Sequence, residues 1–141
     1  MLKSLFGATA LAAALVVLPG CATTTAMKAS PKVVLQVSDN DAQKWNLALN
    51  NAKNVQSALG PDASVEIVAY GPGIGMLTAD SVVSARVAAA VKAGVHVVAC
   101  ENTMKAKKLT PADMNVAVGY VPSGVVELMS KQQQGWGYVR P

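Results

Sequence analysis

The chain has 141 residues, of which 52% are hydrophobic and 14% are charged, and its formal net charge is +4. A positive charge this small and scattered argues against a nucleic-acid partner. The length suits one domain with a modest core, in which valine and alanine predominate.

Residues 1–20 have the order of a bacterial secretory signal. A short positive start that contains Lys3 precedes an apolar stretch over residues 8–18, which is too short to span a bilayer comfortably. The sequence Leu-Pro-Gly-Cys at residues 18–21 resembles the lipobox of bacterial lipoproteins. We therefore expect Cys21 to become a lipidated N-terminus. The alternative is an ordinary cleaved signal in which Cys21 is incidental.

Residues 21–31 are expected to form the lipidated cysteine and a flexible tether, because residues 22–31 show no apolar period. A tether of this length has a typical reach of roughly 18 Å. Its acyl chains would hold the folded part close to a membrane of the cell envelope, facing the periplasm. The residue after Cys21 is Ala22 and not aspartate, which favours the outer membrane over the inner one.

The domain proper, residues 32–141, begins with two strands joined by a long helix. The β-branched run of residues 32–37 predicts a strand. Capping residues follow, and a helical apolar period then runs over residues 41–59, where Gly60-Pro61 ends it. The apolar face of this helix comprises Trp45, Leu47, Leu49, Ala52, Val55 and Leu59. A second strand is expected at residues 64–70.

The alternation of strands and helices continues to the C-terminus. After a glycine-rich loop at residues 71–75, Thr78 or Asp80 is expected to cap a helix that runs to Lys92. The residues of this helix that are expected to face inward are Val82, Val83, Val87, Ala90 and Val91. The remaining elements are a strand at residues 95–100, a short helical piece, a capped turn at 110–113, a strand at 116–121, a helix at 124–133 and a short last strand at 138–141.

Alternating helices and continuously apolar strands predict an α/β fold with a mostly parallel sheet of about five strands, covered on both faces. In such sheets, functional groups gather beyond the carboxyl ends of the strands. The segments expected there are residues 38–41, 71–75, 100–103 and 122–124.

Cys100 ends the third strand and is followed at once by polar residues that start a helix. If Cys21 is lipidated, Cys100 is the only free thiol, so no internal disulfide can form. One interpretation is a nucleophilic thiolate, because a helix start capped by Asn102 or Thr103 lowers the pKa of a thiol, and Lys105 would add to this effect. The other interpretation is a buried core cysteine without reactivity.

The remaining polar residues have simpler explanations. His96 is the only histidine, and it lies four residues before Cys100 on the same strand. The distance between them is roughly 13 Å, which excludes a catalytic pair. Asp39 and Asp41 could be paired acids or metal ligands. They could also be turn and capping residues, and this explanation is simpler. One histidine and one free cysteine fall short of a zinc site, so no metal is expected.

Two further features also have structural explanations beside functional ones. The glycine-rich loop at residues 71–75 matches neither the dinucleotide fingerprint nor the phosphate loop. It either presents backbone amides to an anion or forms a tight loop beside a neighbouring segment. The basic run of Lys105, Lys107 and Lys108 is typical of a solvated face, although it lies near Cys100 in the sequence.

Several segments in order resemble the DsrE/DsrF-like family, in particular its small single-domain branch, whose members are labelled intracellular sulfur oxidation proteins. The most specific segment is Gly-Val-His-Val-Val-Ala-Cys-Glu-Asn-Thr-Met at residues 94–104, and the others are residues 70–74, 121–128 and 134–141. The resemblance implies a three-layer α/β/α fold and homo-oligomers such as trimers or hexamers. In the sulfur-relay members, a cysteine at the end of this strand carries sulfur as a persulfide, and Cys100 occupies the matching position.

The resemblance predicts an envelope-anchored sulfur-relay protein in which Cys100 is the catalytic residue. The residues expected to bind substrate are Gly71, Gly73, Asn102, Thr103, Lys105 and Ser123. The expected partners are a sulfur donor or acceptor protein or a small sulfur anion, and no cofactor is needed. However, the relay members of the family work in the cytoplasm, whereas this chain carries an export signal. Two alternatives therefore stay open: a non-catalytic module that binds a small ligand or a protein, and an oligomeric scaffold with an inert thiol.

Overall fold

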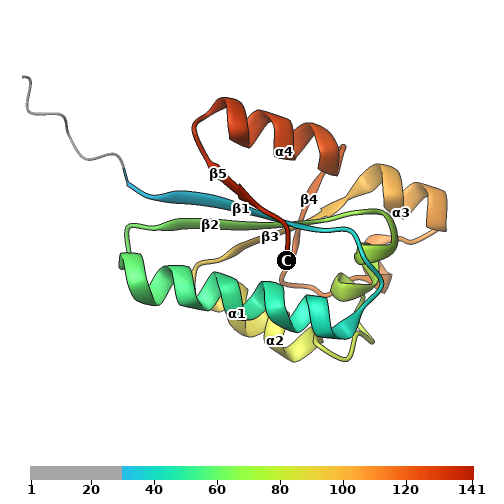
Figure 1. The fold of residues 1–141 in the computed structure, drawn as a ribbon. Coiled ribbons are helices and arrows are strands. Elements are labelled where there is room, and N and C mark those ends of the chain that lie inside the picture. Colours follow the sequence, from blue (N-terminus) through green and yellow to red (C-terminus); the bar gives the residue numbers. More distant parts are fainter. Residues whose placement is uncertain (1–29) are drawn as a thin grey trace, which may run out of the picture.

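The computed structural model describes residues 30–141, which form an α/β fold with a single central sheet (Figure 1). The expected signal peptide, the lipidated Cys21 and the tether up to residue 29 lie outside the described residues. Within the described part of the chain, no helix is both long and apolar enough to cross a membrane.

The central sheet has five strands in the order β4-β3-β2-β1-β5. The strands are β1 at Lys32–Val37, β2 at Ser64–Ala69, β3 at His96–Cys100, β4 at Gly119–Val121 and β5 at Gly137–Val139. Every neighbouring pair is parallel, which confirms the predicted fold class.

The helices form a layer on each face of the sheet (Figure 1). They are α1 at Ala42–Leu59, α2 at Ser84–Lys92, α3 at Glu101–Lys107 and α4 at Gly124–Gln133, with 3-10 helices η1 at Gly71–Leu77 and η2 at Pro111–Asp113. The helices α1 and α2 cover one face and α4 covers the other, while α3 lies beside one end of the sheet. The three-layer arrangement implied by the family resemblance is therefore confirmed.

The helix α1 shows how local signals in the sequence set its ends and its buried face. Asp41 caps its start, because the amide of Gln43 donates a hydrogen bond to the Asp41 side chain at 2.8 Å. Its end is Gly60, whose φ of 87° is in the left-handed region that glycine adopts without strain. Two residues expected on the apolar face, Leu47 and Leu59, are instead 46% and 52% exposed. Leu47 is two positions from both Trp45 and Leu49, about 160° around the helix from each of these buried residues, and Leu59 lies in the last turn.

The predicted starts of α2 and β4 are wrong for a common physical reason. The segment before α2 is tied to the segment before β4 by backbone hydrogen bonds from Ala79 to Asp113 at 2.9 Å and from Asn115 to Leu77 at 2.8 Å. Together with the antiparallel bridge between Thr78 and Met114, these contacts hold both segments in an extended conformation, so α2 begins only at Ser84 and β4 only at Gly119. Val82, expected to face inward, is consequently 81% exposed, and Val116, expected in a strand, is fully exposed. Residues 71–75, expected as a loop, are part of η1.

The two faces of the sheet are packed unequally. The larger hydrophobic cluster fills the space between the sheet and the α1–α2 layer, whereas the cluster beneath α4 contains only Val34, Val68 and Leu128 as buried members. A buried ion pair also joins α4 to the sheet, because Lys131 Nζ lies 2.6 Å from Glu66 Oε2. The second oxygen of Glu66 has no hydrogen-bond partner, and burial raises the pKa of this carboxyl.

This pair predicts unequal costs for removing its members. Lys131→Met leaves Glu66 buried without a counter-charge and is expected to lower the free energy of unfolding by about 3 kcal/mol. Glu66→Gln is expected to cost less, because Lys131 also lies 3.4 Å from Glu127 and 4.4 Å from the centre of the Trp136 ring. Urea unfolding of both variants measures the difference.

Acidification provides a second readout of the same pair. The pKa of Glu66 is raised in the folded state. A Glu66 without its counter-charge therefore lowers the free energy of unfolding when the pH is above that pKa, and this loss disappears when the pH falls below it. The deficit of Lys131→Met should therefore shrink as the pH falls. Equal destabilisation by the two substitutions at neutral pH would contradict this account.

Candidate functional site

The candidate site lies where β3 and β4 end side by side. Cys100 is the last residue of β3 and pairs with Val121 at the end of β4. The helix α3 begins directly after Cys100, and α4 begins at Gly124, so the starts of two helices meet at this edge. A hydrogen bond from the amide of Asn102 to the carbonyl of Pro122, at 3.2 Å, joins the two connections.

Cys100 is a buried residue at the end of β3. The residue is 4% exposed, and it belongs to neither of the two hydrophobic clusters. Burial by itself raises the pKa of the thiol, because it disfavours the charged form. The Thr103 hydroxyl and the amides of Gly124, Thr103 and Asn102 act in the opposite direction and outweigh burial, so the pKa lies below that of an ordinary cysteine.

The Thr103 side chain is held by a hydrogen bond from the start of η1. Its Oγ1 accepts a hydrogen bond from the amide of Gly71 at 2.9 Å, which leaves the hydroxyl proton free to point elsewhere. Of the groups that lower the pKa of Cys100, this hydroxyl has the largest effect. Gly71 adopts a φ of 55°, so the turn that presents its amide also favours glycine. The structure thus links Cys100, Thr103 and Gly71, which the sequence analysis proposed as site residues.

Gly124 is a site residue that the sequence analysis missed. A Cβ at this position would lie 2.9 Å from Cβ of Tyr70 and 3.1 Å from its ring, so only glycine fits here without a shift. The start of α4 therefore packs directly on Tyr70, and this contact helps bring the Gly124 amide to Cys100. The sequence Pro-Ser-Gly at residues 122–124 marked a helix start, but it gave no sign of this close contact.

The other predicted binding residues have different surroundings. Ser123 is the N-cap residue of α4, directly before Gly124, although its side chain makes no capping hydrogen bond. Gly73 is explained by packing, since a Cβ there would lie 2.4 Å from the carbonyl oxygen of Val37. Lys105 is exposed in the last turn of α3, and the groups that lower the pKa of Cys100 are neutral donors rather than lysines.

The remaining polar candidates have structural roles or lie apart. His96 begins β3 and is exposed, at the opposite end of the strand from Cys100. Asp41 caps α1, and Asp39 forms salt bridges with Lys44 at 3.2 Å and Arg140 at 3.3 Å. Within residues 30–141, no group of three or more histidine, cysteine, aspartate or glutamate side chains is arranged to hold a metal ion.

A depression of about 390 Å³ lies near the carboxyl edge of the sheet. Its lining residues are Asn40, Pro72, Ile74, Gly75, Thr78, Lys107 and Leu109. The glycine-rich segment therefore forms part of a hollow, as expected for a segment at this edge, but Cys100 does not line it.

Comparisons with known proteins agree with this geometry. The sequence model of the DsrE/DsrF-like family matches residues 31–141. The solved structure of MTH1491 from Methanobacterium thermoautotrophicum, described as a protein of unknown function, is 32% identical, with a TM-score of 0.76 over 79% of this chain and 99% of that one. BT1422 from Bacteroides thetaiotaomicron, also described as of unknown function, shares the fold, with 14% identity and a TM-score of 0.68 over 82% of this chain and 99% of that one.

None of the curated proteins matches the chain. The family match nevertheless covers every strand and helix of the described fold, from β1 to β5. The chain therefore belongs to the DsrE/DsrF-like family.

Proposed function

We propose that this protein is a sulfur-relay protein of the cell envelope, in which Cys100 carries sulfur as a persulfide. The observation that carries the proposal is the polar environment of a buried thiol. An inert structural cysteine packs among apolar side chains, whereas the Thr103 hydroxyl and three backbone amides lower the pKa of Cys100 and so favour its ionised form. A thiolate is the nucleophilic form of cysteine.

The proposed step is a thiol–persulfide exchange. The Cys100 thiolate attacks the outer sulfur of a donor persulfide, a new S–S bond forms on Cys100, and the donor leaves as a thiolate with the electron pair of the broken S–S bond. With thiosulfate as donor, the leaving group is sulfite. An acceptor thiolate then takes the outer sulfur in the same way and releases Cys100. The donors that favour the Cys100 thiolate also suit the anionic end of the persulfide.

Because Cys100 is only 4% exposed, the exchange requires local opening. The start of α4 is the wall of the site best suited to move. It supplies the Gly124 amide, and the cluster beneath α4 is the smaller of the two hydrophobic clusters. We propose that a sulfur donor or acceptor gains access by displacement of this helix start, since lightly packed elements open at lower cost.

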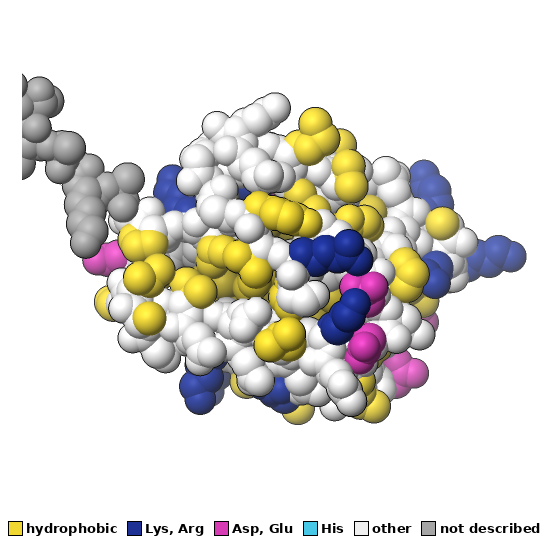
Figure 2. Space-filling model, viewed as in Figure 1, with side chains coloured by type: hydrophobic (Ala, Val, Ile, Leu, Met, Phe, Trp, Pro, Cys, Tyr) yellow, Lys and Arg dark blue, Asp and Glu magenta, His cyan; other side chains and the backbone are white. Residues whose placement is uncertain are grey.

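The envelope anchor and the oligomer belong to the same proposal. Cys21 would attach the protein to a membrane, most favourably the outer one, with the domain facing the periplasm. A second copy would cover apolar side chains that β5 exposes at the edge of the sheet. These are Tyr138 and Val139. Figure 2 shows a band of hydrophobic side chains on the side of the molecule where β5 forms the sheet edge. Light scattering should accordingly give the mass of a trimer or a hexamer. A monomer at micromolar concentration would contradict the proposed oligomer.

The low exposure of Cys100 favours one alternative function, a non-catalytic binding module. In such a module, the ligand would bind beside α3 and α4 without forming a bond to sulfur. Cys100→Ser would then leave the affinity for the ligand nearly unchanged. A relay protein loses its sulfur-carrying capacity with the same substitution.

The relay proposal predicts a covalent product. Incubation of the full chain with polysulfide or thiosulfate should add the mass of one sulfur atom to the peptide that contains Cys100, as measured by mass spectrometry without reducing agent. The Cys21→Ser variant is the matched control and should gain the same mass at Cys100. The proposal is wrong if Cys100→Ser gains that mass elsewhere in the domain, or if native Cys100 stays unmodified and reacts only after unfolding.

The Thr103 hydroxyl predicts a change in the pH dependence of alkylation. Thr103→Val removes the donor that lowers the pKa of Cys100 most, so the pKa should rise and alkylation by iodoacetamide near neutral pH should slow severalfold. Thr103→Ser restores a hydroxyl and should restore the rate. Thr110→Val changes a threonine in the capping box of η2, which is not among the groups that shift the pKa of Cys100, and should leave the rate unchanged.

The lowered pKa of Cys100 also makes the stability of the folded state depend on pH. Because the folded state lowers the pKa of Cys100, the contribution is present above the pKa of an unfolded cysteine and is lost as the pH falls through the folded value. A Thr103→Val protein whose alkylation profile matches that of the unsubstituted chain would show that the hydroxyl does not act on the sulfur.

A further inference from the structure

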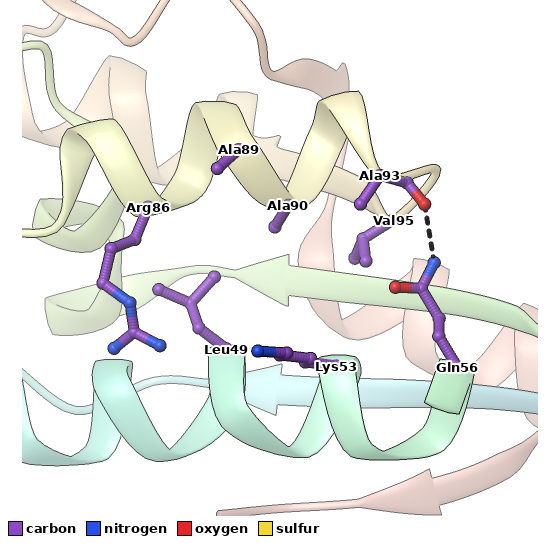
Figure 3. A pocket seen from close by; sticks show the side chains of 8 residues that line it. All are labelled: Leu49, Lys53, Gln56, Arg86, Ala89, Ala90, Ala93 and Val95. Carbon is purple, nitrogen blue, oxygen red and sulfur yellow. Dashed lines mark hydrogen bonds between the residues drawn. The ribbon is translucent and has the colours of Figure 1, made fainter. Parts of the chain in front are cut away.

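A groove of about 310 Å³ lies between α1 and α2, on the opposite face of the sheet from α4 (Figure 3). Its floor is apolar, because Leu49 and Val95 line it and are 4% and 2% exposed. Ala89 and Ala90 of α2 and Ala93, which directly follows that helix, also line the groove, and their short side chains leave it open. Its volume is at the lower end of the range of about 300–1,000 Å³ that small-molecule sites occupy.

Two positive charges line this apolar groove without a counter-charge. Lys53 comes from α1 and Arg86 from α2, and neither helix contains an aspartate or a glutamate. Among residues 30–141, the basic residues that form salt bridges are Lys44, Lys131 and Arg140. The charges of Lys53 and Arg86 are therefore available to an anion that enters the groove.

The guanidinium of Arg86 is held in place by neutral groups. It donates hydrogen bonds across the groove to the side-chain oxygens of Asn46 and Asn50, the latter at 2.8 Å. Amide oxygens orient the guanidinium but leave its charge uncompensated, and an arginine with five N–H donors keeps others free. An oriented cation of this kind loses little conformational freedom when it binds an anion.

The groove has a charged end and a closed end. In Figure 3, Arg86 lies at one end, and Lys53 and Leu49 extend along α1 beside the floor. At the other end, Nε2 of Gln56 donates a hydrogen bond to the carbonyl oxygen of Ala93 at 2.9 Å, which joins α1 to α2. From Arg86 to Ala93 the helix rises by about 10 Å, which suits a short aliphatic chain and is too short for a long-chain lipid.

We infer that this groove binds an anionic amphiphile with one short aliphatic chain. The anionic head group would lie between Arg86 and Lys53. The chain would lie over Leu49 and the alanines of α2, toward the Gln56–Ala93 hydrogen bond. The combination of an apolar floor with cations supplies both requirements of such a ligand, since apolar burial gives affinity and the charged contacts fix orientation. The inference does not depend on Cys100, which lies at the junction with α4.

Calorimetric titration of the full chain with decanoate, kept below its micelle concentration, tests the inference. Decanoate should bind at one site per chain. Acetate, which has the head group without the chain, and decylammonium, which has the chain with a positive head group, should not bind. Arg86→Gln should weaken decanoate binding about tenfold, as expected for one charge-assisted contact. Lys92→Gln removes the same charge from α2 outside the groove and should leave the affinity unchanged.

Blocking the groove provides a second test that does not change charge. Ala89→Leu places a larger side chain on the wall and should abolish decanoate binding, whereas Ala85→Leu, at an exposed position of α2 outside the groove, should retain it. Circular dichroism establishes that both variants are folded. Equal weakening by Arg86→Gln and Lys92→Gln, or unchanged binding in folded Ala89→Leu, would overturn the inference. Cys100→Ser should bind decanoate normally, so this result is separate from the sulfur-relay proposal.

Discussion

The candidate site depends on one constraint, the parallel pairing of β3 with β4 at the residue where both strands end. Because Cys100 lies beside Val121, the two connections that follow start helices next to each other. Their amides converge on a single sulfur, and the close contact between Gly124 and Tyr70 keeps the second helix start in place. Donors from both helix starts contribute to the lowered pKa of the thiol.

The chemistry at Cys100 is decided by two opposing electrostatic effects. Burial removes water from the thiol and disfavours its negative form, whereas the hydroxyl of Thr103 and the amides favour that form. The donors prevail, so the fold supports a thiolate in a place with little solvent. A buried thiolate is shielded from oxidants, but it also requires movement of the surrounding structure before it can react. In the proposed mechanism, this movement takes place at the start of α4, which packs on the smaller of the two hydrophobic clusters.

Much of the fold was predictable from the sequence, because the signals were local. The strand at residues 32–37, the Asp41 cap and the stop at Gly60 follow from residue type alone. The failures involve tertiary contacts. The hydrogen bonds between residues 77–79 and 113–115 are the reason that α2 and β4 are shorter than predicted. No local sequence pattern indicates these hydrogen bonds. At the site, Cys100 and Thr103 stood out by position and residue type. Gly124 did not, because its role comes from a contact with Tyr70, distant in the sequence.

The central claim is that Cys100 is ionised more readily than an ordinary cysteine despite its burial. A direct measurement is the ultraviolet absorbance of the thiolate in the folded Cys21→Ser chain as a function of pH, with the Cys21→Ser/Cys100→Ser chain as the blank. The account predicts that the thiol titrates below the range of a free cysteine, since the donors around it outweigh burial. A titration at or above that range, as burial alone would produce, would contradict the account.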